Sequence, residues 1–208
     1  MNTNMGNLII LEGGEGTGKT SQALRLKRYL DSIKLDAVVL SELRDNQATA
    51  SISSALLSGD PPVSSLASAF LIAAARAETY LVVGSLLIGG TSVIMDRGPL
   101  STLVYQSDCG EVDEDIVVAL NSWSMRGQKA DLVLVLDCDV ATANERRTAR
   151  QGSSDVFEEL DSTFHQHVRD AFLRRARENS LPVVDASQEF ESVASAIAEH
   201  MRSVGSAG

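Results

Sequence analysis

Short apolar runs recur along the chain, each bounded by glycine, proline or polar residues, and such runs predict buried strands. They span residues 8–11, 37–40, 92–95, 132–136 and 182–184. Longer segments between them carry apolar residues at helical spacing. The helices predicted from this spacing span residues 20–33, 52–57, 66–88, 116–123, 141–150, 157–178 and 189–201. Strands that alternate with helices are typical of an α/β fold, so we expect a three-layer sandwich around a mainly parallel sheet.

The segment 66–88 is long and strongly apolar, and it predicts a central helix packed on both sides. We expect no stretch to reach the length of a membrane span, and hence no membrane partner. Residues 204–208 are typical of a frayed tail. A chain of 208 residues suits one domain, residues 1–208.

The chain is acidic, with 18 Lys and Arg against 28 Asp and Glu and a formal net charge of −10. Such a chain has no general attraction to nucleic acid or to anionic membranes. Cys109 and Cys138 lie in unrelated contexts, which fits a reducing cytoplasm. His165 and His167 have no further ligand nearby, so we expect exposed helix positions rather than a metal site. No basic segment precedes the first apolar run, which argues against a signal peptide and favours a cytoplasmic protein.

A glycine-rich loop lies between the first predicted strand and the first predicted helix. It reads Gly13-Gly14-Glu15-Gly16-Thr17-Gly18-Lys19-Thr20, followed by Ser21, and matches the G-x4-G-K-[ST] pattern. The backbone N–H groups of such a loop and the positive end of the helix bind phosphate. Lys19 is expected to reach the β- and γ-phosphates and Thr20 to ligate the metal, so ATP and Mg²⁺ are the expected cofactors. A glycine-rich turn without a ligand is the alternative, and the strand–loop–helix context argues against it.

Asp96 and Arg97 directly follow another predicted strand, at the carboxyl edge where α/β sheets bind ligands. Arg97 has the fork of donors that clamps a phosphate, and Asp96 is assigned with Thr20 to the metal. A surface ion pair is the alternative. A P-loop alone is shared by kinases, GTPases and motors. A GTPase also needs an N-K-x-D guanine motif, which the sequence lacks.

Four motifs, in this order, resemble the thymidylate kinase family of P-loop nucleoside monophosphate kinases. They are Glu12-Gly13-x-Glu15-Gly16-x-Gly18-Lys19-Thr20, Asp96-Arg97 with Ser101 and Tyr105-Gln106, Asp131-Leu132-x-Leu134-x-Leu136-Asp137, and Asp185-Ala186-Ser187. The resemblance covers residues 8–201. It implies a P-loop NTPase fold and phosphoryl transfer from ATP–Mg²⁺ to a deoxynucleoside monophosphate, dTMP above others, in nucleotide biosynthesis. A kinase for another or modified pyrimidine monophosphate and a degenerate P-loop nucleotide-binding protein are the alternatives.

The resemblance also implies roles in acceptor binding. Glu15 occupies the position that reads the 3′-hydroxyl of the sugar, and Arg97 that of the acceptor-phosphate ligand. Arg76 matches the arginine that hydrogen-bonds the base; an exposed helix residue is its alternative, weakened by the small apolar residues around it. The residues that match those around base and sugar are Ser101, Tyr105 and Gln106. For Tyr105, a packed core side chain is the competing interpretation.

Gly16 stands where another family subgroup carries a basic P-loop residue. In the subgroup without it, arginines of a lid supply positive charge to the transferring phosphoryl group. Arg147 and Arg150 are the candidates here, in a lid segment around residues 147–156. A solvated helix face is the alternative, but phosphoryl transfer requires cationic stabilisation. Arg44 is a further candidate for catalysis and substrate binding, because it stands where the family has Arg-Glu.

The chain departs from the family pattern at three places. Residues 44–49 lack the proline of the Arg-Glu-Pro-Gly-Gly-Thr motif. Ile72 occupies the position of a phenylalanine that stacks on the base, with Phe70 two residues earlier, and Asp155-Val156 replaces an Asp-Arg pair in the lid. These changes bear on the thymine preference more than on the kinase chemistry. The resemblance further implies a homodimer, with the helix at residues 66–88 as candidate interface, although a buried core helix would show the same pattern.

Overall fold

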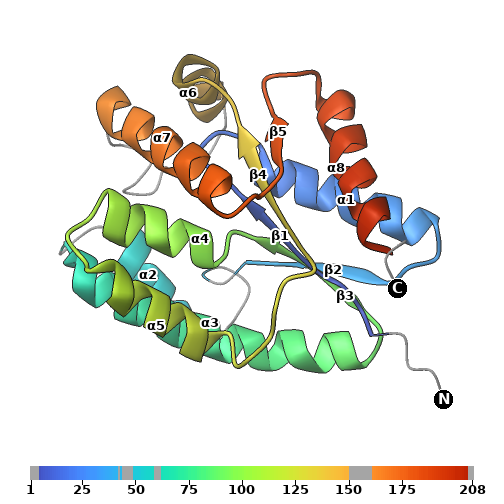
Figure 1. Ribbon diagram of the computed structural model, residues 1–208, viewed down its shortest axis with the longest axis horizontal. Helices are drawn as coiled ribbons and strands as arrows, with labels where there is room; N and C mark the ends of the chain where they lie inside the picture. The colour runs from blue at the N-terminus through green and yellow to red at the C-terminus, as the bar shows by residue number, and fades with distance from the viewer. Residues whose placement is uncertain (1–4, 42, 44–48, 59–61, 150–160, 206–208) are drawn as a thin grey trace.

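The computed structural model describes residues 5–41, 43, 49–58, 62–149 and 161–205. Their helices and strands are β1 (Leu8–Glu12), α1 (Lys19–Ser32), β2 (Ala37–Leu40), α2 (Ala50–Ser58), α3 (Ser65–Ile88), β3 (Ser92–Asp96), α4 (Pro99–Thr102), the π-helical turn η2 (Leu103–Asp108), α5 (Glu114–Ser124), β4 (Leu132–Asp137), α6 (Val140–Ala149), α7 (Ser162–Glu178), β5 (Val183–Asp185) and α8 (Phe190–Gly205). Figure 1 shows their arrangement.

The strands of the described residues form one sheet in the order β2-β3-β1-β4-β5. Every neighbouring pair is parallel, as in the register that places Leu8 opposite Val93 and Ile9 opposite Leu132. The predicted three-layer α/β sandwich is therefore confirmed. All carboxyl ends of the strands meet at one edge, which is the edge where ligands bind in such sheets.

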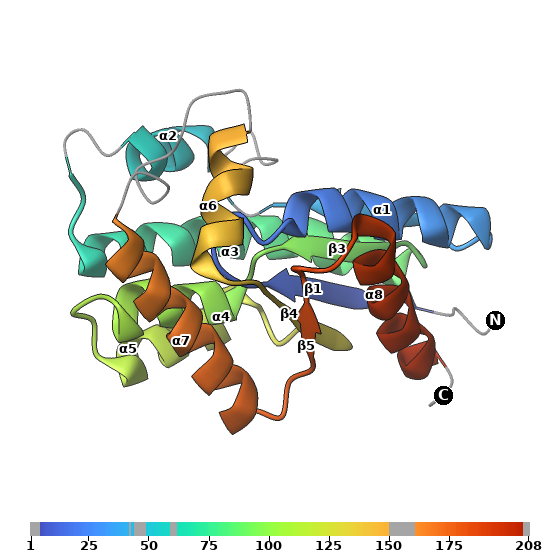
Figure 2. The same cartoon turned by 90° about the horizontal axis from the view of Figure 1, so that it is seen from above.

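Helices cover both faces of the sheet, and β1 supplies side chains to each. Ile9 and Leu11 pack with α1 and α8 on one face, whereas Leu8 and Ile10 pack with α3 on the other. Figure 2 shows α1 and α8 together on one side of the strands. β1 is fully buried, and each such Leu or Ile side chain contributes roughly 1.5–3 kcal/mol through burial. This core holds the loop that follows β1 in a fixed place.

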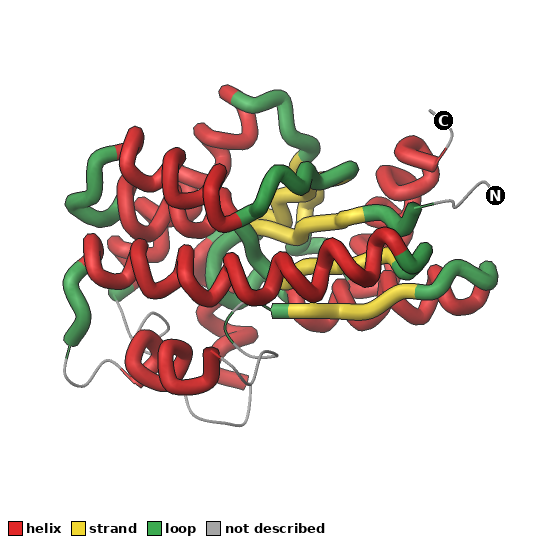
Figure 3. Tube along the Cα trace, turned by 90° about the horizontal axis from the view of Figure 1, so that it is seen from below, coloured by secondary structure: helices red, strands yellow, loops and turns green. Residues whose placement is uncertain are grey.

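Helix α3 runs along the sheet, as Figure 3 shows from below, and one of its faces stays open. Its exposed large apolar residues are Leu66, Phe70, Leu81, Val82 and Ile88. The prediction of a helix packed on both sides is therefore wrong. The expectation that no stretch is long and apolar enough for a membrane span is also wrong, because α3 meets both criteria. In the fold, its opposite face packs on the sheet through Tyr80, Val83 and Leu87.

Two further predictions need correction. α7 begins at Ser162, where Asp161 caps it by accepting a hydrogen bond from the Phe164 N–H (2.8 Å), and the predicted start of this helix at 157–160 lies outside the described residues. His165 is buried and not exposed, since it shares a helical face with the buried Val168 three residues on. α8 continues to Gly205, past the start of the predicted tail.

The helical segment of α4 and η2 was not predicted. Its first residues, Gly98 and Pro99, are typical of a loop, although proline is favourable at the first position of a helix. The π-helical turn that follows changes the spacing of the apolar residues, which removes the usual helical periodicity.

Candidate active site

One cavity of about 580 Å³ lies at the carboxyl edge of the sheet. The loop after β1 lines it, together with Ser41 after β2, Arg97 after β3 and Ala186 after β5. Residues far apart in the chain meet here because the parallel strands all point to this edge. The cavity also receives side chains from α3, α4, η2 and α6.

The loop from Gly13 to Gly18 has a backbone that few residues other than glycine adopt. Gly16 has φ +78°, and an added Cβ would lie 2.3 Å from the carbonyl oxygen of Ala143 on α6. Gly18 has φ +87° and caps the N-terminus of α1, so the first helical N–H groups open toward the cavity. Thr17 Oγ1 donates to the Gly14 carbonyl (3.0 Å) and fixes the loop from within. Such a loop is a preformed anion site.

Lys19 is buried under this loop, although it lines the cavity. Its ammonium donates to the carbonyl oxygens of Gly13 (3.0 Å) and Gly14 (2.6 Å). Burial, followed by repulsion from Arg97, lowers the pKa of Lys19 from 10.5 to about 8, while Glu15 acts in the opposite direction. The site therefore holds a cation that the negative charge of a bound phosphate would stabilise.

Thr20 and Asp96 bring two oxygen ligands together at the start of α1. The Thr20 hydroxyl donates to Asp96 Oδ2 (2.5 Å), and both residues line the cavity. Among the described residues, no three or more His, Cys, Asp and Glu side chains form a metal-binding group. This pair fits Mg²⁺, which is bound by one or two protein oxygens and takes its other ligands from phosphates and water.

Arg97 joins the end of β3 to the P-loop. Its backbone has φ +76°, an uncommon conformation that costs about 1–3 kcal/mol for a residue other than glycine. Its guanidinium donates to the Gly13 carbonyl (3.0 Å), to Ser101 Oγ (3.1 Å) and to a carboxylate oxygen of Glu15. Burial alone would lower the pKa of Arg97, but Glu15 raises it above its usual value, so Arg97 stays charged.

Glu12 does not line the cavity but holds Ser101, which does, and sequence reasoning missed this role because Glu12 stood out only as part of a motif. It is fully buried at the end of β1. Its carboxylate accepts hydrogen bonds from the backbone N–H groups of Leu100 (3.0 Å) and Ser101 (3.3 Å) and from the Ser101 hydroxyl (2.6 Å). Glu12 therefore anchors the N-terminus of α4. In the sequence, a carboxylate directly after an apolar run was the pattern that could have indicated this role.

Arg76 is buried in the wall of the same cavity, where the alternative of an exposed helix residue does not hold. Its guanidinium donates to Asn121 Oδ1 and to Thr102 Oγ1 (2.7 Å), and Asn121 in turn donates to the Pro99 carbonyl (3.0 Å). Thr102 and Asn121 were not among the predicted residues, because the helices that carry them were missed or read only for their apolar pattern. This network fixes the orientation of Arg76.

Ile72 also lines the cavity, one helical turn before Arg76. Phe70, the nearest aromatic residue in the sequence, is 54% exposed and does not line it. The aromatic ring that the family resemblance placed near the base is therefore not supplied by Phe70.

Tyr105 and Gln106 reach the cavity from η2. The Tyr105 ring packs on Phe164 and Phe172 of α7, with both centroid distances 6.3 Å, and its hydroxyl lies 3.4 Å from Glu15 Oε1. Tyr105 is thus a packed side chain and also a residue of the cavity wall, so the two interpretations of Tyr105 do not exclude each other. Gln106 is buried, and its Oε1 has no hydrogen-bond partner within the part of the chain that the structure describes.

The arginines of α6 approach the cavity from its other end. Arg146 donates to the Ala186 carbonyl (2.8 Å), and Arg147 donates to Asn144 Oδ1 (3.2 Å). Both line the cavity. Arg44, Arg150 and most of the predicted lid at 147–156 lie outside the described residues.

A phosphate-binding loop that shares one cavity with Arg76 and Arg97 defines the class, a nucleoside monophosphate kinase with the P-loop NTPase fold. The chain belongs to the thymidylate kinase family, whose model matches residues 11–197. The thymidylate kinase of Marinomonas sp. (strain MWYL1) is 36% identical over 200 residues that cover 94% of both chains. That of Clavibacter michiganensis subsp. michiganensis is 32% identical over 206 residues and 98% of both chains. That of Geobacter sulfurreducens is 33% identical over 204 residues, 94% of this chain and 96% of the relative. The family predicted from the motifs is thus confirmed.

Proposed function

We propose that this enzyme transfers the terminal phosphoryl group of ATP–Mg²⁺ to dTMP, forming dTDP in nucleotide biosynthesis. One observation carries the proposal. The buried Arg76 and the partly buried Arg97 line the same cavity as the P-loop with Lys19, so a phosphate donor and an acceptor can meet in it. Membership of the thymidylate kinase family supports dTMP as the acceptor.

The donor is held by the P-loop, residues 13–21. The backbone N–H groups around Gly16 and Gly18 receive the phosphates, and Lys19 neutralises the charge that develops during transfer. Thr20 and Asp96 would hold Mg²⁺, which would further neutralise the charge of the phosphate oxygens. Positioning and charge neutralisation account for most of the lowering of the barrier, so no covalent intermediate with the protein is needed.

The acceptor lies toward α3, α4 and η2. Arg97 clamps its phosphate, and Glu15, which is within reach of both Arg97 and Tyr105, accepts a hydrogen bond from the 3′-hydroxyl. Arg76 donates to the base from a position fixed by Thr102. The remaining acceptor residues in this proposal are Arg44, Ile72, Asp96, Ser101 and Gln106.

Arg147 and Arg150 form part of a lid over residues 147–156 within a single kinase domain of residues 1–208. Arg147 already lines the cavity, which supports a role for its cation near the transferring phosphoryl group. Gly16 carries no positive charge for the transferring phosphoryl group. Arg147 and Arg150 supply that charge together with Arg44, Lys19 and Arg97. Since α6 contacts Gly16 directly, a basic side chain there would collide with the helix backbone.

The enzyme acts as a cytoplasmic homodimer, with neither nucleic acid nor membrane as partner. The exposed apolar stripe of α3 supports the dimer. The two free cysteines, Cys109 and the buried Cys138, are consistent with a reducing compartment.

A coupled assay of ADP release tests the proposal across dTMP, dUMP, dCMP, dAMP and dGMP. We expect dTMP and dUMP to be preferred over dCMP, because the arginine donors of Arg76 suit a carbonyl at the pyrimidine 4-position and not an amino group. Lys19→Ala should abolish turnover and leave the fold intact. Phosphorylation of dCMP or a purine monophosphate at least as fast as that of dTMP would overturn the proposed acceptor.

A further inference from the structure

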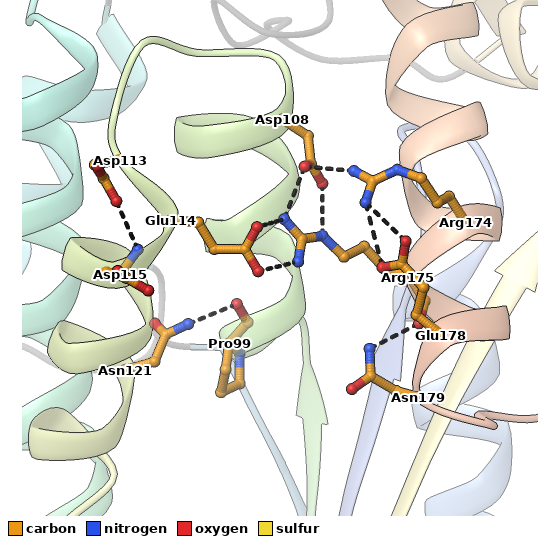
Figure 4. Close-up of polar contacts among 10 residues, drawn as sticks. All are labelled: Pro99, Asp108, Asp113, Glu114, Asp115, Asn121, Arg174, Arg175, Glu178 and Asn179. Atoms are coloured by element: carbon orange, nitrogen blue, oxygen red, sulfur yellow. Dashed lines mark hydrogen bonds and ion pairs between the residues drawn. The ribbon is translucent and has the colours of Figure 1, made fainter.

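An ionic cluster lies on the side of η2 that faces α7, and Figure 4 shows it in close-up. Its centre is Arg175 on α7, whose side chain is 7% exposed. The guanidinium donates to both carboxylate oxygens of Asp108, at 2.9 and 2.8 Å, and to both of Glu114, at 2.5 and 2.8 Å. We call Arg175 with Asp108 and Glu114 the Arg175 clip.

The clip joins three elements that are separate in the sequence. Asp108 is the last residue of η2 and Glu114 the first of α5, so Arg175 closes the loop of residues 109–113 between them. Arg174 adds a second bond from α7 to Asp108 (2.5 Å), although its side chain is 41% exposed. Burial alone would raise the pKa of Asp108, but the hydrogen bonds from Arg175 and Arg174 hold it below its usual value. The carboxylate is therefore charged throughout the neutral range.

Each joined element carries a residue that lines the acceptor side of the cavity or contacts one that does. η2 carries Tyr105 and Gln106, three and two residues before Asp108. α7 carries Phe164 and Phe172, between which Tyr105 packs. α5 carries Asn121, which holds Arg76. A shift of α7 away from η2 would therefore move Tyr105 and the wall around Gln106.

From this geometry we propose that Arg175 is a positioning residue for the acceptor nucleotide, acting through Asp108 and Glu114 on the π-helical turn that carries Tyr105 and Gln106. The proposal rests on the proposed function, since it assigns these residues to acceptor binding. On the donor side, Lys19 and Thr17 bond to carbonyl groups of the P-loop itself. Tyr105 contacts the P-loop at Glu15, which the proposed function assigns to the acceptor.

The primary test compares Arg175→Met with Arg177→Met. Arg177 lies in the same last turn of α7 but is exposed, so its loss removes an equal charge without touching the clip. For Arg175→Met we expect the KM for dTMP to rise about tenfold, with the KM for ATP within about twofold of wild type. Arg177→Met should match wild type for both substrates. Arg175→Lys should give an intermediate KM for dTMP, because an ammonium can satisfy one carboxylate but lacks the two-sided fork.

A structural role alone would lower the melting temperature of Arg175→Met and leave the two KM values in their wild-type ratio, and that result overturns the proposal. If Arg175→Met does not fold, Glu114→Gln decides, because Glu114 is half-exposed and its change leaves Asp108 paired. We expect Glu114→Gln to raise the KM for dTMP about two- to threefold, and an unchanged value overturns the proposal. The wild-type enzyme in the same assay distinguishes a failure of the proposed function from a failure of the positioning role. If the wild type does not phosphorylate dTMP, the proposed function itself is refuted. If the wild type turns over normally and Arg175→Met has the same KM values, only the role of the clip is refuted.

Discussion

Around the P-loop, charged side chains are buried before any substrate is present. Lys19 and Glu12 are at most 5% exposed, and Arg97 and Glu15 are largely covered. Each of these side chains is hydrogen-bonded within the protein, Lys19 and Arg97 as donors and Glu12 and Glu15 as acceptors, so they need little reorganisation when a nucleotide binds. Burial disfavours the charged form of Lys19 and lowers its pKa to about 8.

The lowered pKa of Lys19 predicts that ATP binding takes up a proton. At pH 8 the free enzyme holds Lys19 about half protonated, and a bound triphosphate favours the charged ammonium, so binding should take up roughly half a proton. Calorimetric titration of ATP–Mg²⁺ in two buffers of different ionisation enthalpy measures this uptake. Lys19→Met is the control, since it removes the titrating group. Equal proton uptake by Lys19→Met and wild type would assign the effect to the nucleotide instead.

Ile72 gives a second prediction at this scale. An aromatic residue in its place would stack on the acceptor base, which is worth roughly 0.5–1.5 kcal/mol beyond burial, or about two- to tenfold in the KM for dTMP. We therefore expect Ile72→Phe to lower that KM while the KM for ATP stays unchanged. Phe70→Ile is the matched control, because Phe70 lies two residues away and outside the cavity. A raised KM for dTMP in Ile72→Phe would mean that the cavity has no room for the ring.

Among the elements, the strands were predicted most accurately. β2 has the predicted bounds, and the bounds of the other strands differ from their predicted ranges by about one residue. Buried parallel strands are continuous apolar runs, which makes them easy to find in a sequence. α4 and η2 were missed, since Gly98-Pro99 indicates a loop, and a π-helical turn of 6 residues is too short for its wider spacing to show as a period. Because α4 was missed, Thr102 was missed too, although its hydroxyl accepts a hydrogen bond from Arg76. Glu12 was also undervalued, because its three donors come from α4, and contacts across 88 residues of sequence leave no local pattern.

The contact between the P-loop and α6 leads to a prediction about packing. Gly16 and Gly18 both have positive φ, but an added Cβ at Gly16 meets the Ala143 carbonyl at 2.3 Å, whereas at Gly18 it meets nothing within 4 Å. Gly18→Ala should therefore cost only backbone strain, about 1–2 kcal/mol. Gly16→Ala adds a steric clash and should lower the melting temperature further. Thermal unfolding without nucleotide measures both variants, and equal destabilisation would show that α6 shifts freely away from the loop.

For the whole molecule, the open face of α3 is the feature that the single chain leaves unexplained. Apolar side chains recur along it at helical spacing, from Leu66 and Phe70 to Leu81 and Ile88, and Ile88 is 70% exposed. Large contiguous apolar patches on soluble proteins mark interaction sites. A two-fold dimer buries one such patch on each copy, which fits a single stripe on a single helix.

The final prediction concerns this stripe. Leu81→Asp places a charge at its centre, and burying that charge without a partner would oppose association. We expect wild type to show twice the 22.2 kDa mass of the chain in light scattering after gel filtration, and Leu81→Asp to show the single-chain mass. Leu24→Asp is the control, because Leu24 is 48% exposed, close to the 45% of Leu81, but lies on α1 across the sheet. Leu24→Asp should remain dimeric. A monomeric wild type would refute the dimer, and a dimeric Leu81→Asp would move the interface away from α3.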